Sequence, residues 1–391
     1  MKKIGLFLGS DPAQGGVFQY GLTILDAMAT LPDHNISVTV VFVHDGWSKI
    51  IDSHTNLKKI YRPAISWEQP LRMIWRLFDV STWRKIFPYF HPLAKTLLKE
   101  ECDLWIFPSS DEWSYKFPVP ALVSIHDLMH RYEKRFSEVA SALEYRGRDE
   151  AFRNICRWSE GILVDSLIGK QQVIESYGVA PEKIHILPFI APIYMYKEKN
   201  VNDFESRYNL PEKFLFYPAQ FWEHKNHKGL IKAIARLRTD IPSIKLVLTG
   251  SKKNGYASTM KLINDLRINE NIIFLNYVPD VDMPEIYRRA RALVMPTFFG
   301  PTNIPPLEAF ISGCPVAVSN VYGMTEQVGA AALLFNPNSI DEMAECIRKL
   351  WLDDALCADL VEEGKKKAAR WGQDEFNARL QNIIGRILSV A

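Results

Sequence analysis

The chain has 391 residues, of which 47% are hydrophobic and 24% charged. This length and composition predict two domains with full cores and exclude a disordered chain, collagen and a small disulfide scaffold. The formal net charge of +2 lacks the basic excess of a dedicated nucleic-acid-binding protein. The cysteines are scattered without a CxxC pair, so neither a zinc site nor a disulfide framework is expected, and a reducing cytoplasm fits best.

The N-terminal stretch contains two lysines followed by a short apolar run that ends at Gly9 and then becomes rich in glycine. This pattern predicts a first core strand rather than a signal peptide. No window approaches the roughly 18 to 20 consecutive apolar residues of a membrane span. We therefore expect a soluble or peripheral protein.

Short apolar runs alternate with segments of helical period along most of the chain, which predicts βαβ units with parallel sheets. Six runs lie in the first half, at 4–9, 38–44, 104–108, 121–127, 161–166 and 184–189. Six more lie in the second half, at 214–219, 245–250, 272–275, 292–297, 315–319 and 332–335. The predicted fold class is α/β, with two doubly wound, Rossmann-like domains.

A charged, turn-rich stretch without a clean period separates the two sets of strands. It predicts an N-terminal domain over 1–195, a linker over 196–212 and a C-terminal domain over 213–373. Residues 374–391 show an apolar stripe from Phe376 to Leu388 at helical spacing. This last segment is expected to be a helix that docks on another part of the protein.

The region from 61 to 100 is expected to be helical, and its first part, 61–90, combines aromatic and basic residues. Leu71, Ile74, Trp75 and Phe78 can share one helical face, with Arg72 and Arg76 nearer its flanks. Helices of this kind lie on anionic membrane surfaces, but a helix pair packed on the N-terminal sheet gives the same pattern. Both interpretations stay open.

The motif GPTNIPPLEAF, at 300–310, lies between two predicted strands. Pro305 and Pro306 suit the first turn of a helix, whose backbone N–H groups can bind phosphate oxygens. Glu308 lies in the same turn and could accept bonds from a ribose diol. A capped core helix is the alternative, because carboxylates favour helix N-termini in any case.

Two further motifs follow predicted strands. Lys225 lies at the junction of a strand and a helix, where doubly wound sheets bind ligands, and its ammonium could neutralise a diphosphate; a surface lysine is the alternative. Gly15 and Gly16 open a predicted helix and would let the backbone approach a phosphate or sugar closely.

His126 and Asp127 end a predicted strand of the first domain. The histidine could bond a substrate hydroxyl or carbonyl while Asp127 orients it, although a structural His-Asp pair explains the sequence equally well. The chain contains no GxSxG, Walker A or HExxH element, so hydrolase, ATPase and zinc-protease functions lack support.

In order and spacing, these motifs resemble the family 4 (group 1) glycosyltransferases, nucleotide-sugar enzymes of the GT-B fold, over essentially the whole chain. The family has two Rossmann-like domains facing a cleft, with the donor mostly on the C-terminal domain, the acceptor mostly on the N-terminal one, and a last helix that crosses back. The resemblance rests on Gly15-Gly16, His126-Asp127, Lys225-Asn226, Gly250, 276–290, 305–316 and 323–326.

The resemblance implies roles for individual residues. Glu308 is similar to the second glutamate of the E-x7-E motif, which holds the ribose, and Lys225 to the lysine on the donor diphosphate. The implied catalytic residues are His126, Lys225 and Glu308, and no metal is expected. The implied donor residues are Gly16, Gln220, Lys225, Asn226, Gly250, Tyr277, Val278, Thr302, Asn303, Ile304 and Glu308, and the acceptor residues are Gly15, Gly16, His126 and Asp127.

Two positions depart from the family pattern. The first glutamate of E-x7-E is replaced by Gly300, and the usual arginine before the lysine by Gln220. We expect Thr302 and Asn303 to take over sugar recognition. The GPTN and YPAQFW variants resemble a subgroup of bacterial surface-polysaccharide and O-antigen enzymes.

The implied function is a retaining, metal-independent transfer of a hexose or deoxyhexose to a glycan or polyprenyl-linked acceptor, in the cytoplasm or at the inner face of its membrane. No cofactor is implied beyond the nucleotide-sugar substrate. The sequence leaves open whether its nucleotide is GDP, UDP or dTDP, and it leaves open the oligomeric state of the protein. A catalytically silent sugar-nucleotide or glycan-binding partner is the alternative, since fold does not fix function. A sugar-nucleotide epimerase is disfavoured by the PPLEAF segment and the lysine.

Overall fold

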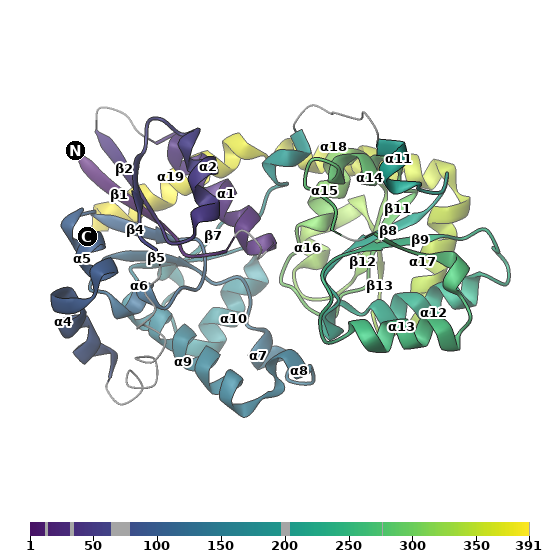
Figure 1. The fold of residues 1–391 in the computed structure, drawn as a ribbon, viewed down its shortest axis with the longest axis horizontal. Coiled ribbons are helices and arrows are strands. Elements are labelled where there is room, and N and C mark those ends of the chain that lie inside the picture. The colour runs from purple at the N-terminus through teal and green to yellow at the C-terminus, as the bar shows by residue number, and fades with distance from the viewer. Residues whose placement is uncertain (12–14, 32–34, 64–78, 197–203, 276, 391) are drawn as a thin grey trace. The chain divides into compact units, whose positions relative to one another are not determined.

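The computed structural model describes residues 1–11, 15–31, 35–63, 79–196, 204–275 and 277–390. Its contacts divide the chain into two compact units (Figure 1). The first unit comprises Met1–Leu128, Ala142–Pro188 and Gln373–Ala391, and the second comprises Met129–Ser141 and Phe189–Gly372. Each unit is described by itself below.

The first unit is built on a parallel sheet with the strand order β3-β2-β1-β4-β5-β6-β7. In its register Leu6 of β1 lies opposite Val40 of β2 and Ile106 of β4. The strands are β1 (Lys2–Leu8), β2 (Ile36–Phe42), β3 (Lys58–Tyr61), β4 (Leu104–Phe107), β5 (Ala121–Ser124), β6 (Gly161–Val164) and β7 (Ile184–Ile186). Its helices are α1 (Gly16–Ala29), α2 (Ser48–Asp52), α4 (Val80–Phe90), α5 (Pro92–Lys99), α6 (Trp113–Lys116), α9 (Ala142–Trp158), α10 (Leu167–Tyr177) and α19 (Gln373–Val390).

The second unit is built on a parallel sheet with the order β10-β9-β8-β11-β12-β13. Its strands are β8 (Leu215–Pro218), β9 (Leu246–Thr249), β10 (Ile272–Leu275), β11 (Ala292–Met295), β12 (Val316–Ser319) and β13 (Leu333–Phe335). Its longer helices are α12 (His227–Leu237), α13 (Tyr256–Asp265), α14 (Met283–Arg289), α15 (Pro305–Ser312), α17 (Ile340–Leu352) and α18 (Asp354–Arg370). Shorter ones are α7 (Met129–Tyr132), α8 (Ser137–Ala140), α11 (Phe204–Tyr208) and α16 (Met324–Val328), with 3-10 turns η5 (Ile193–Tyr196) and η6 (Glu223–Lys225).

Both sheets confirm the predicted α/β class with two Rossmann-like folds. Central strands such as β4, β9 and β12 are buried along their whole length, because helices cover both faces of a parallel sheet. All twelve predicted strands are present. The prediction missed β3, a short edge strand whose sequence Lys-Lys-Ile-Tyr lacks a buried apolar run.

The boundaries of the units differ from the predicted ones by a few residues at 189–195 and at 373, and by a whole segment at 129–141. Residues 129–141 belong to the second unit, although they lie in the middle of the predicted N-terminal domain over 1–195. The segment packs there because Met129, Phe136 and Val139 form an apolar cluster with Phe299. A contact between positions so far apart in the sequence leaves no local signal.

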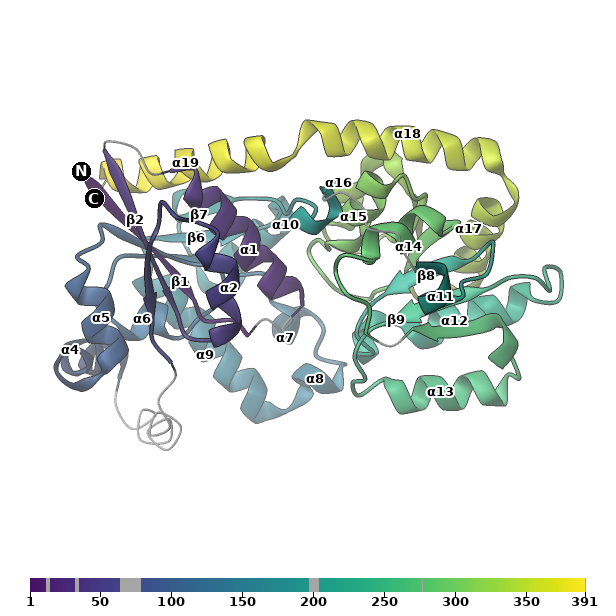
Figure 2. The ribbon, with the colours of Figure 1, turned by 45° about the horizontal axis from the view of Figure 1, so that its top comes forward.

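The last helix, α19, packs in the first unit, where its neighbour is α1 (Figure 2). Phe376, Leu380 and Ile383 of its apolar stripe are buried. The ring of Phe376 lies edge-on to the ring of Tyr20 of α1, with 6.5 Å between the centroids. The stripe seen in the sequence is therefore a packing face.

Of the aromatic segment at 61–90, residues 64–78 lie outside the described residues, and with them Trp67, Trp75 and Phe78. Helix α4 follows, and Asp79 caps its N-terminus by accepting a bond from the backbone N of Thr82 at 3.0 Å. One face of α4 buries Trp83 and Phe87, while Ile86, Tyr89 and Phe90 are exposed. Within the described residues, none of the helices has the length and apolar character needed to span a bilayer.

Candidate functional site

The order of strands in the second unit predicts where a ligand would bind. Strand β8 lies between β9 and β11, so the chain runs from β8 to one side of the sheet and later returns on the other. Such a point of reversal leaves a crevice at the carboxyl ends of the strands, and doubly wound sheets bind ligands there. The loops after β8 and β11 contain Lys225 and Asn303.

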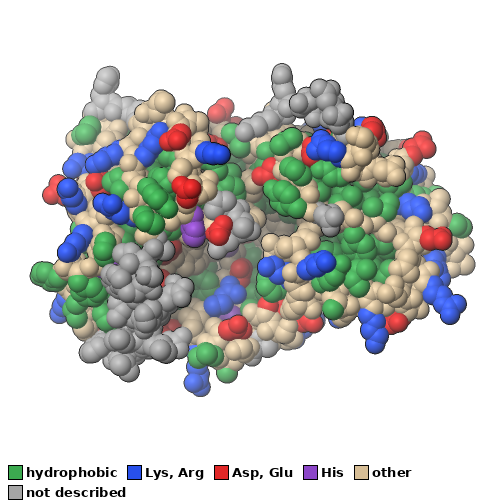
Figure 3. Space-filling model, in the orientation of Figure 1, with side chains coloured by type: hydrophobic (Ala, Val, Ile, Leu, Met, Phe, Trp, Pro, Cys, Tyr) green, Lys and Arg blue, Asp and Glu red, His purple; other side chains and the backbone are tan. Residues whose placement is uncertain are grey.

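A pocket of about 450 Å³ opens beside this point, at the carboxyl ends of β8, β9 and β10. On the face shown in Figure 3, hydrophobic side chains gather over β8 and β9 with Lys and Arg side chains around them. The pocket has the size of a small-molecule site. It is lined by Tyr194, Pro218, Ala219, Gln220, Phe221, Thr249, Gly250, Ser251, Lys252, Tyr256, Phe274, Leu275, Tyr277, Val278, Asp280 and Met283.

Four of the predicted donor residues line this pocket: Gln220, Gly250, Tyr277 and Val278. Gly250 has a φ of 144°, and a Cβ there would lie 2.2 Å from the carbonyl oxygen of Ala219, so only glycine fits this wall. The Gln220 Oε1 atom accepts a bond of 2.9 Å from Trp222 Nε1. Tyr277 is 82% exposed, whereas Val278 is buried beneath the pocket.

Lys225 lies at the end of η6, between β8 and α12. Its turn is fixed by the hydroxyl of Tyr217, which donates to the Lys225 carbonyl at 2.9 Å. The Lys225 Nζ atom donates to Asn303 Oδ1 at 3.2 Å. This bond joins the loop after β8 to the loop after β11, so two predicted donor residues meet at the point of reversal.

Gly300, at the position where the resemblance predicts a glutamate, has a φ of 138°. A Cβ at this position would lie 2.4 Å from Nδ2 of Asn303, whose side chain already fills the space. Asn303 is itself held by α16, because Gln327 donates to its carbonyl at 2.7 Å and accepts from its backbone N at 3.0 Å. The glycine therefore makes room for the amide that bonds Lys225.

Asn226 differs from the other predicted donor residues because its side chain is used by the fold. Its φ of 56° is left-handed, and its Oδ1 caps α12 by accepting from the backbone N of Gly229 at 3.1 Å. Its Nδ2 donates to the carbonyls of Pro296 and Pro337, each at 3.0 Å. These contacts give the side chain a structural role, while its backbone stays next to Lys225.

Glu308, in the first turn of α15, is 5% exposed. Its carboxylate accepts hydrogen bonds from the hydroxyls of Tyr194 and Tyr287, the latter at 2.5 Å. Burial raises the pKa of Glu308 and the charge of Asp280 adds to this, although both tyrosine hydroxyls act in the opposite direction. Tyr194 also lines the pocket, so the carboxylate lies directly behind a pocket residue.

Thr302 and Ile304 flank Asn303 in the same loop and are half-buried. Ile304 precedes α15, and its carbonyl accepts from the backbone N of Leu307 at 2.9 Å and of Glu308 at 3.2 Å. The helix whose first turn was predicted to contain Pro305 and Pro306 is present, and it begins at Pro305.

The four predicted acceptor residues lie in the first unit. Gly15 precedes α1 with a φ of 60°, and Gly16 is the first residue of that helix. His126 follows β5 and donates from Nε2 to the carbonyl of Pro108 at 2.8 Å, which fixes its tautomer. Burial lowers the pKa of His126, and Asp127 pairs with Arg148 at 3.0 Å.

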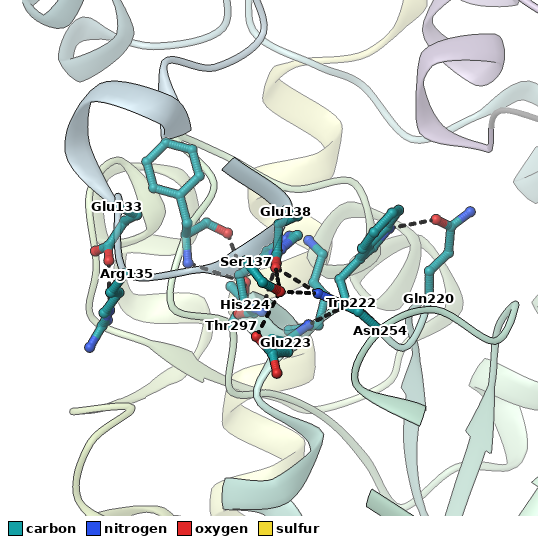
Figure 4. Close-up of polar contacts among 12 residues, drawn as sticks. Glu133, Arg135, Ser137, Glu138, Gln220, Trp222, Glu223, His224, Asn254 and Thr297 are labelled. Carbon is teal, nitrogen blue, oxygen red and sulfur yellow. Dashed lines mark hydrogen bonds and ion pairs between the residues drawn. The ribbon is translucent and has the colours of Figure 1, made fainter. Parts of the chain in front are cut away.

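Several side chains at this edge of the second unit were not expected from the sequence. Tyr194 and Tyr287 bond Glu308, and Gln327 holds Asn303. Figure 4 shows a further network in which Glu138 and Ser137 point toward His224, Glu223 and Asn254. Tyr287 lay in the stretch 276–290 that the resemblance singled out, and Glu223 and His224 lay in the motif around Lys225. The remaining contacts join segments that are distant in the sequence. In the described part of the chain, no group of three or more His, Cys, Asp or Glu side chains could hold a metal ion.

The chain resembles known proteins in sequence. Residues 198–367 match the family described as glycosyl transferases, group 1. Over 170 residues the chain is 32% identical to O-antigen chain mannosyltransferase B of Escherichia coli, covering 43% of this chain and 45% of that protein. Over 196 residues it is 28% identical to O-antigen chain mannosyltransferase RfbU of Salmonella typhimurium, covering 50% and 52%. The chain thus spans about half the length of these curated relatives.

Solved structures resemble the chain over nearly its whole length. Anabaena Alr3699/HepE in complex with UDP-glucose has a TM-score of 0.73 at 17% identity, with 100% of both chains covered. WaaG, a glycosyltransferase involved in lipopolysaccharide biosynthesis, has a TM-score of 0.68 at 16% identity, with 97% of this chain and 98% of that chain covered. At these identities the likeness shows the fold, which is of the predicted GT-B type. Residues 198–367, which lie in the second unit, are therefore similar to a group 1 glycosyltransferase domain.

Proposed function

We propose that this protein is a glycosyltransferase that moves a hexose or deoxyhexose from a nucleotide-sugar to a glycan or lipid-linked acceptor in surface-polysaccharide biosynthesis. The observation that carries the proposal is the pocket at the carboxyl ends of β8, β9 and β10. The bond between Lys225 and Asn303, which joins the loops after β8 and β11 at the point of strand reversal, supports it. Gln220, Gly250, Tyr277 and Val278 line the pocket and would bind the nucleotide. The mannosyltransferases that the chain resembles favour a hexose donor.

The electrostatic contribution comes from Lys225 and the N-terminus of α15. In the proposed reaction the bond between the anomeric carbon and the leaving phosphate oxygen breaks, and a bond to the acceptor oxygen forms on the same face of the sugar. The acceptor hydroxyl gives its proton to the leaving phosphate oxygen. The protein supplies positioning and stabilises the charge that develops on the diphosphate, without a metal ion.

Glu308 would hold the ribose diol of the donor, and Thr302 and Asn303 the sugar. In the first unit, His126 would bond the reacting sugar, with Gly15, Gly16 and Asp127 on the acceptor side. His126 suits this role because burial lowers its pKa and keeps its ring neutral at pH 7. A neutral ring can exchange hydrogen bonds with sugar hydroxyls without adding charge.

We propose a cytoplasmic protein that contacts the inner face of the membrane through the region 61–90. Within the described residues, the exposed side chains of Ile86, Tyr89 and Phe90 on α4 are the surface that supports this contact. The double change Ile86→Ser and Tyr89→Ser should lower binding to vesicles containing anionic lipid, whereas Leu352→Ser, an exposed leucine on α17, should not. Equal binding of all three proteins would favour a helix that serves only packing.

The proposed function is tested first by nucleotide binding. A nucleotide present at about 100 times its Kd should add roughly 2.7 kcal/mol of stability, which is visible as a rise in Tm. We would measure Tm with UDP, GDP, dTDP, ADP and CMP, and then assay transfer from the matching nucleotide-sugars. A selective shift together with turnover supports the glycosyltransferase. A shift without turnover would favour a silent sugar-nucleotide-binding partner, and the absence of both would refute the donor site.

A further inference from the structure

Residues 129–141, here called the strap, leave the first unit in the middle of its fold. The chain passes from Leu128 into the strap, which packs on the second unit, and re-enters the first unit at Ala142. The strap consists of α7, a short connection and α8. Neither the predicted site nor the family match, which starts at 198, includes it.

The polar contacts of the strap centre on Glu138. Its Oε1 accepts bonds from Nδ1 of His224 at 2.6 Å and from the backbone N of His224 at 3.1 Å. Its Oε2 accepts from Nδ2 of Asn254 at 2.9 Å. Ser137 adds a bond to Glu223 at 3.1 Å and accepts one from Asn254 at 2.8 Å. Figure 4 shows these side chains converging on the carboxylate.

The apolar contacts of the strap lie on the neighbouring loop. Phe136 packs in a buried cluster with Phe299, and its ring lies 5.5 Å from that of Phe298. The guanidinium of Arg135 lies 4.6 Å above the Phe298 ring. Glu133 accepts a bond from the hydroxyl of Tyr322 at 2.8 Å. The strap thus contacts the loops that follow β8, β9, β11 and β12.

Two of these loops hold residues proposed to bind the donor: Lys225 at its diphosphate and Asn303 at its sugar. His224 directly precedes Lys225, and Phe298 and Phe299 directly precede Gly300. The two loops are also joined beneath the strap, because the His224 carbonyl accepts from the backbone N of Phe298 at 2.8 Å. A movement of His224 would therefore move both loops.

We propose that Glu138 is a positioning residue that fixes the turn 223–225 and so aims Lys225 at the donor diphosphate. The inference rests on the proposed function. The carboxylate bonds both the backbone N and the ring of His224, so it holds the backbone and the side chain of this residue in one orientation. Its side chain is only 9% exposed, so its charge would be costly without these bonds.

The electrostatics agree with this geometry. Burial alone would raise the pKa of Glu138, but the bonds from His224 and Asn254 outweigh it and lower the pKa to about 2. The group is therefore a carboxylate at neutral pH. Charge-assisted hydrogen bonds of this kind are shorter and stronger than neutral ones, which suits a group that must hold a loop in place.

The test compares kcat and KM for the donor in Glu138→Ala, Glu138→Gln and Asp103→Asn. Asp103 is the matched control, since it accepts a backbone N–H from Lys3 at 2.7 Å and a bond from Lys2 in the first unit. We expect Glu138→Ala to lower kcat about 10- to 100-fold with little change in KM. The reason is that Lys225 would no longer be aimed at the charge that develops on the diphosphate in the transition state, whereas binding of the donor in the ground state would be unaffected. Glu138→Gln should recover part of kcat, and Asp103→Asn should stay within about twofold of wild type.

A double-variant cycle separates positioning from simple destabilisation. If Glu138 acts through Lys225, Glu138→Ala should lower kcat in the wild type but have almost no effect in Lys225→Ala. Additive effects, or an unchanged kcat in Glu138→Ala, would overturn the proposal. If the wild type transfers no sugar, the proposed function fails and the role of Glu138 fails with it, whereas additive effects in an active wild type overturn only the role of Glu138. Absence of any nucleotide binding would overturn both.

Discussion

The carboxyl edges of the two sheets are built in different ways. In the first unit, His126 donates to the backbone carbonyl of Pro108, and Gly15 presents bare backbone ahead of α1. In the second unit, side chains from different loops bond one another: Lys225 to Asn303 and Glu138 to His224. One edge relies on local backbone, the other on partners distant in the sequence.

This difference predicts how many other residues a substitution at each edge should disturb. Replacing a side chain that bonds nearby backbone should disturb only its surroundings, because the strands hold that backbone in position without it. Side chains that bond across loops hold those loops in register, so the loss of one is felt by the others. The predictions below test this contrast, from the largest expected effect to the smallest.

The largest effect is expected for Lys225→Ala. Removing one preorganised electrostatic group should lower kcat about 100- to 1,000-fold, or about 2.7 to 4 kcal/mol of transition-state stabilisation. Lys228→Ala is the matched control, since this lysine lies one turn later on α12 and is exposed. Steady-state kinetics with the donor identified by the Tm panel make the measurement. Wild-type kinetics in Lys225→Ala would remove the lysine from the mechanism.

The second prediction concerns pH and Glu138. The pKa of this carboxyl falls from 4.5 to about 2 on folding, so the folded state holds its proton less tightly than the unfolded chain. The resulting stability is complete above the unfolded pKa and is lost as the pH falls from about 5 toward 2. At about 1.4 kcal/mol for each pKa unit, the contribution at pH 7 is roughly 3 to 4 kcal/mol at most.

Urea unfolding of wild type and Glu138→Gln between pH 7 and the lowest pH at which both fold measures this contribution. The free energy of unfolding should differ most at pH 7, and the difference should shrink below pH 5. Asp127→Asn, which loses a more exposed pair with Arg148 in the first unit, should show a smaller difference. A difference that does not depend on pH would mean that the Glu138 charge is not linked to folding.

The sequence predicted what depends on local pattern. Central strands were found because burial on both faces requires continuous apolar runs. Gly250 came from the family resemblance, and the structure shows that a Cβ there would meet the Ala219 carbonyl. The strap could not be predicted, since its place depends on Phe136 meeting Phe299 far along the chain. Tyr194 was missed for the same reason: it meets Glu308, 114 positions away.

The structural reason for a glycine at position 300 could likewise not be predicted from the sequence, in which Gly300 was noted only as a departure from the family motif. The structure gives it a positive φ and places Asn303 in the space of its missing Cβ. Gly300→Ala should therefore lower the free energy of unfolding by about 1 to 3 kcal/mol. Gly385→Ala on α19, where a Cβ meets nothing within 4 Å, should instead stabilise the protein by roughly 0.5 to 1 kcal/mol. Equal Tm values for the two variants would contradict the strain assigned to Gly300.

The smallest effect, and the finest test of the contrast, is expected for Tyr194→Phe. The Tyr194 hydroxyl occupies an oxygen of Glu308 that the ribose diol would need. Its loss leaves a buried acceptor short of one donor, which should lower the free energy of unfolding by about 1 to 2 kcal/mol. A nucleotide whose ribose replaces the missing donor should bind up to about tenfold more tightly, because it no longer displaces a tyrosine. Titration calorimetry with the nucleotide and its 2′-deoxy analogue separates the outcomes. A gain limited to the ribonucleotide places the diol on Glu308, whereas equal affinities in variant and wild type would leave Glu308 a purely structural carboxylate.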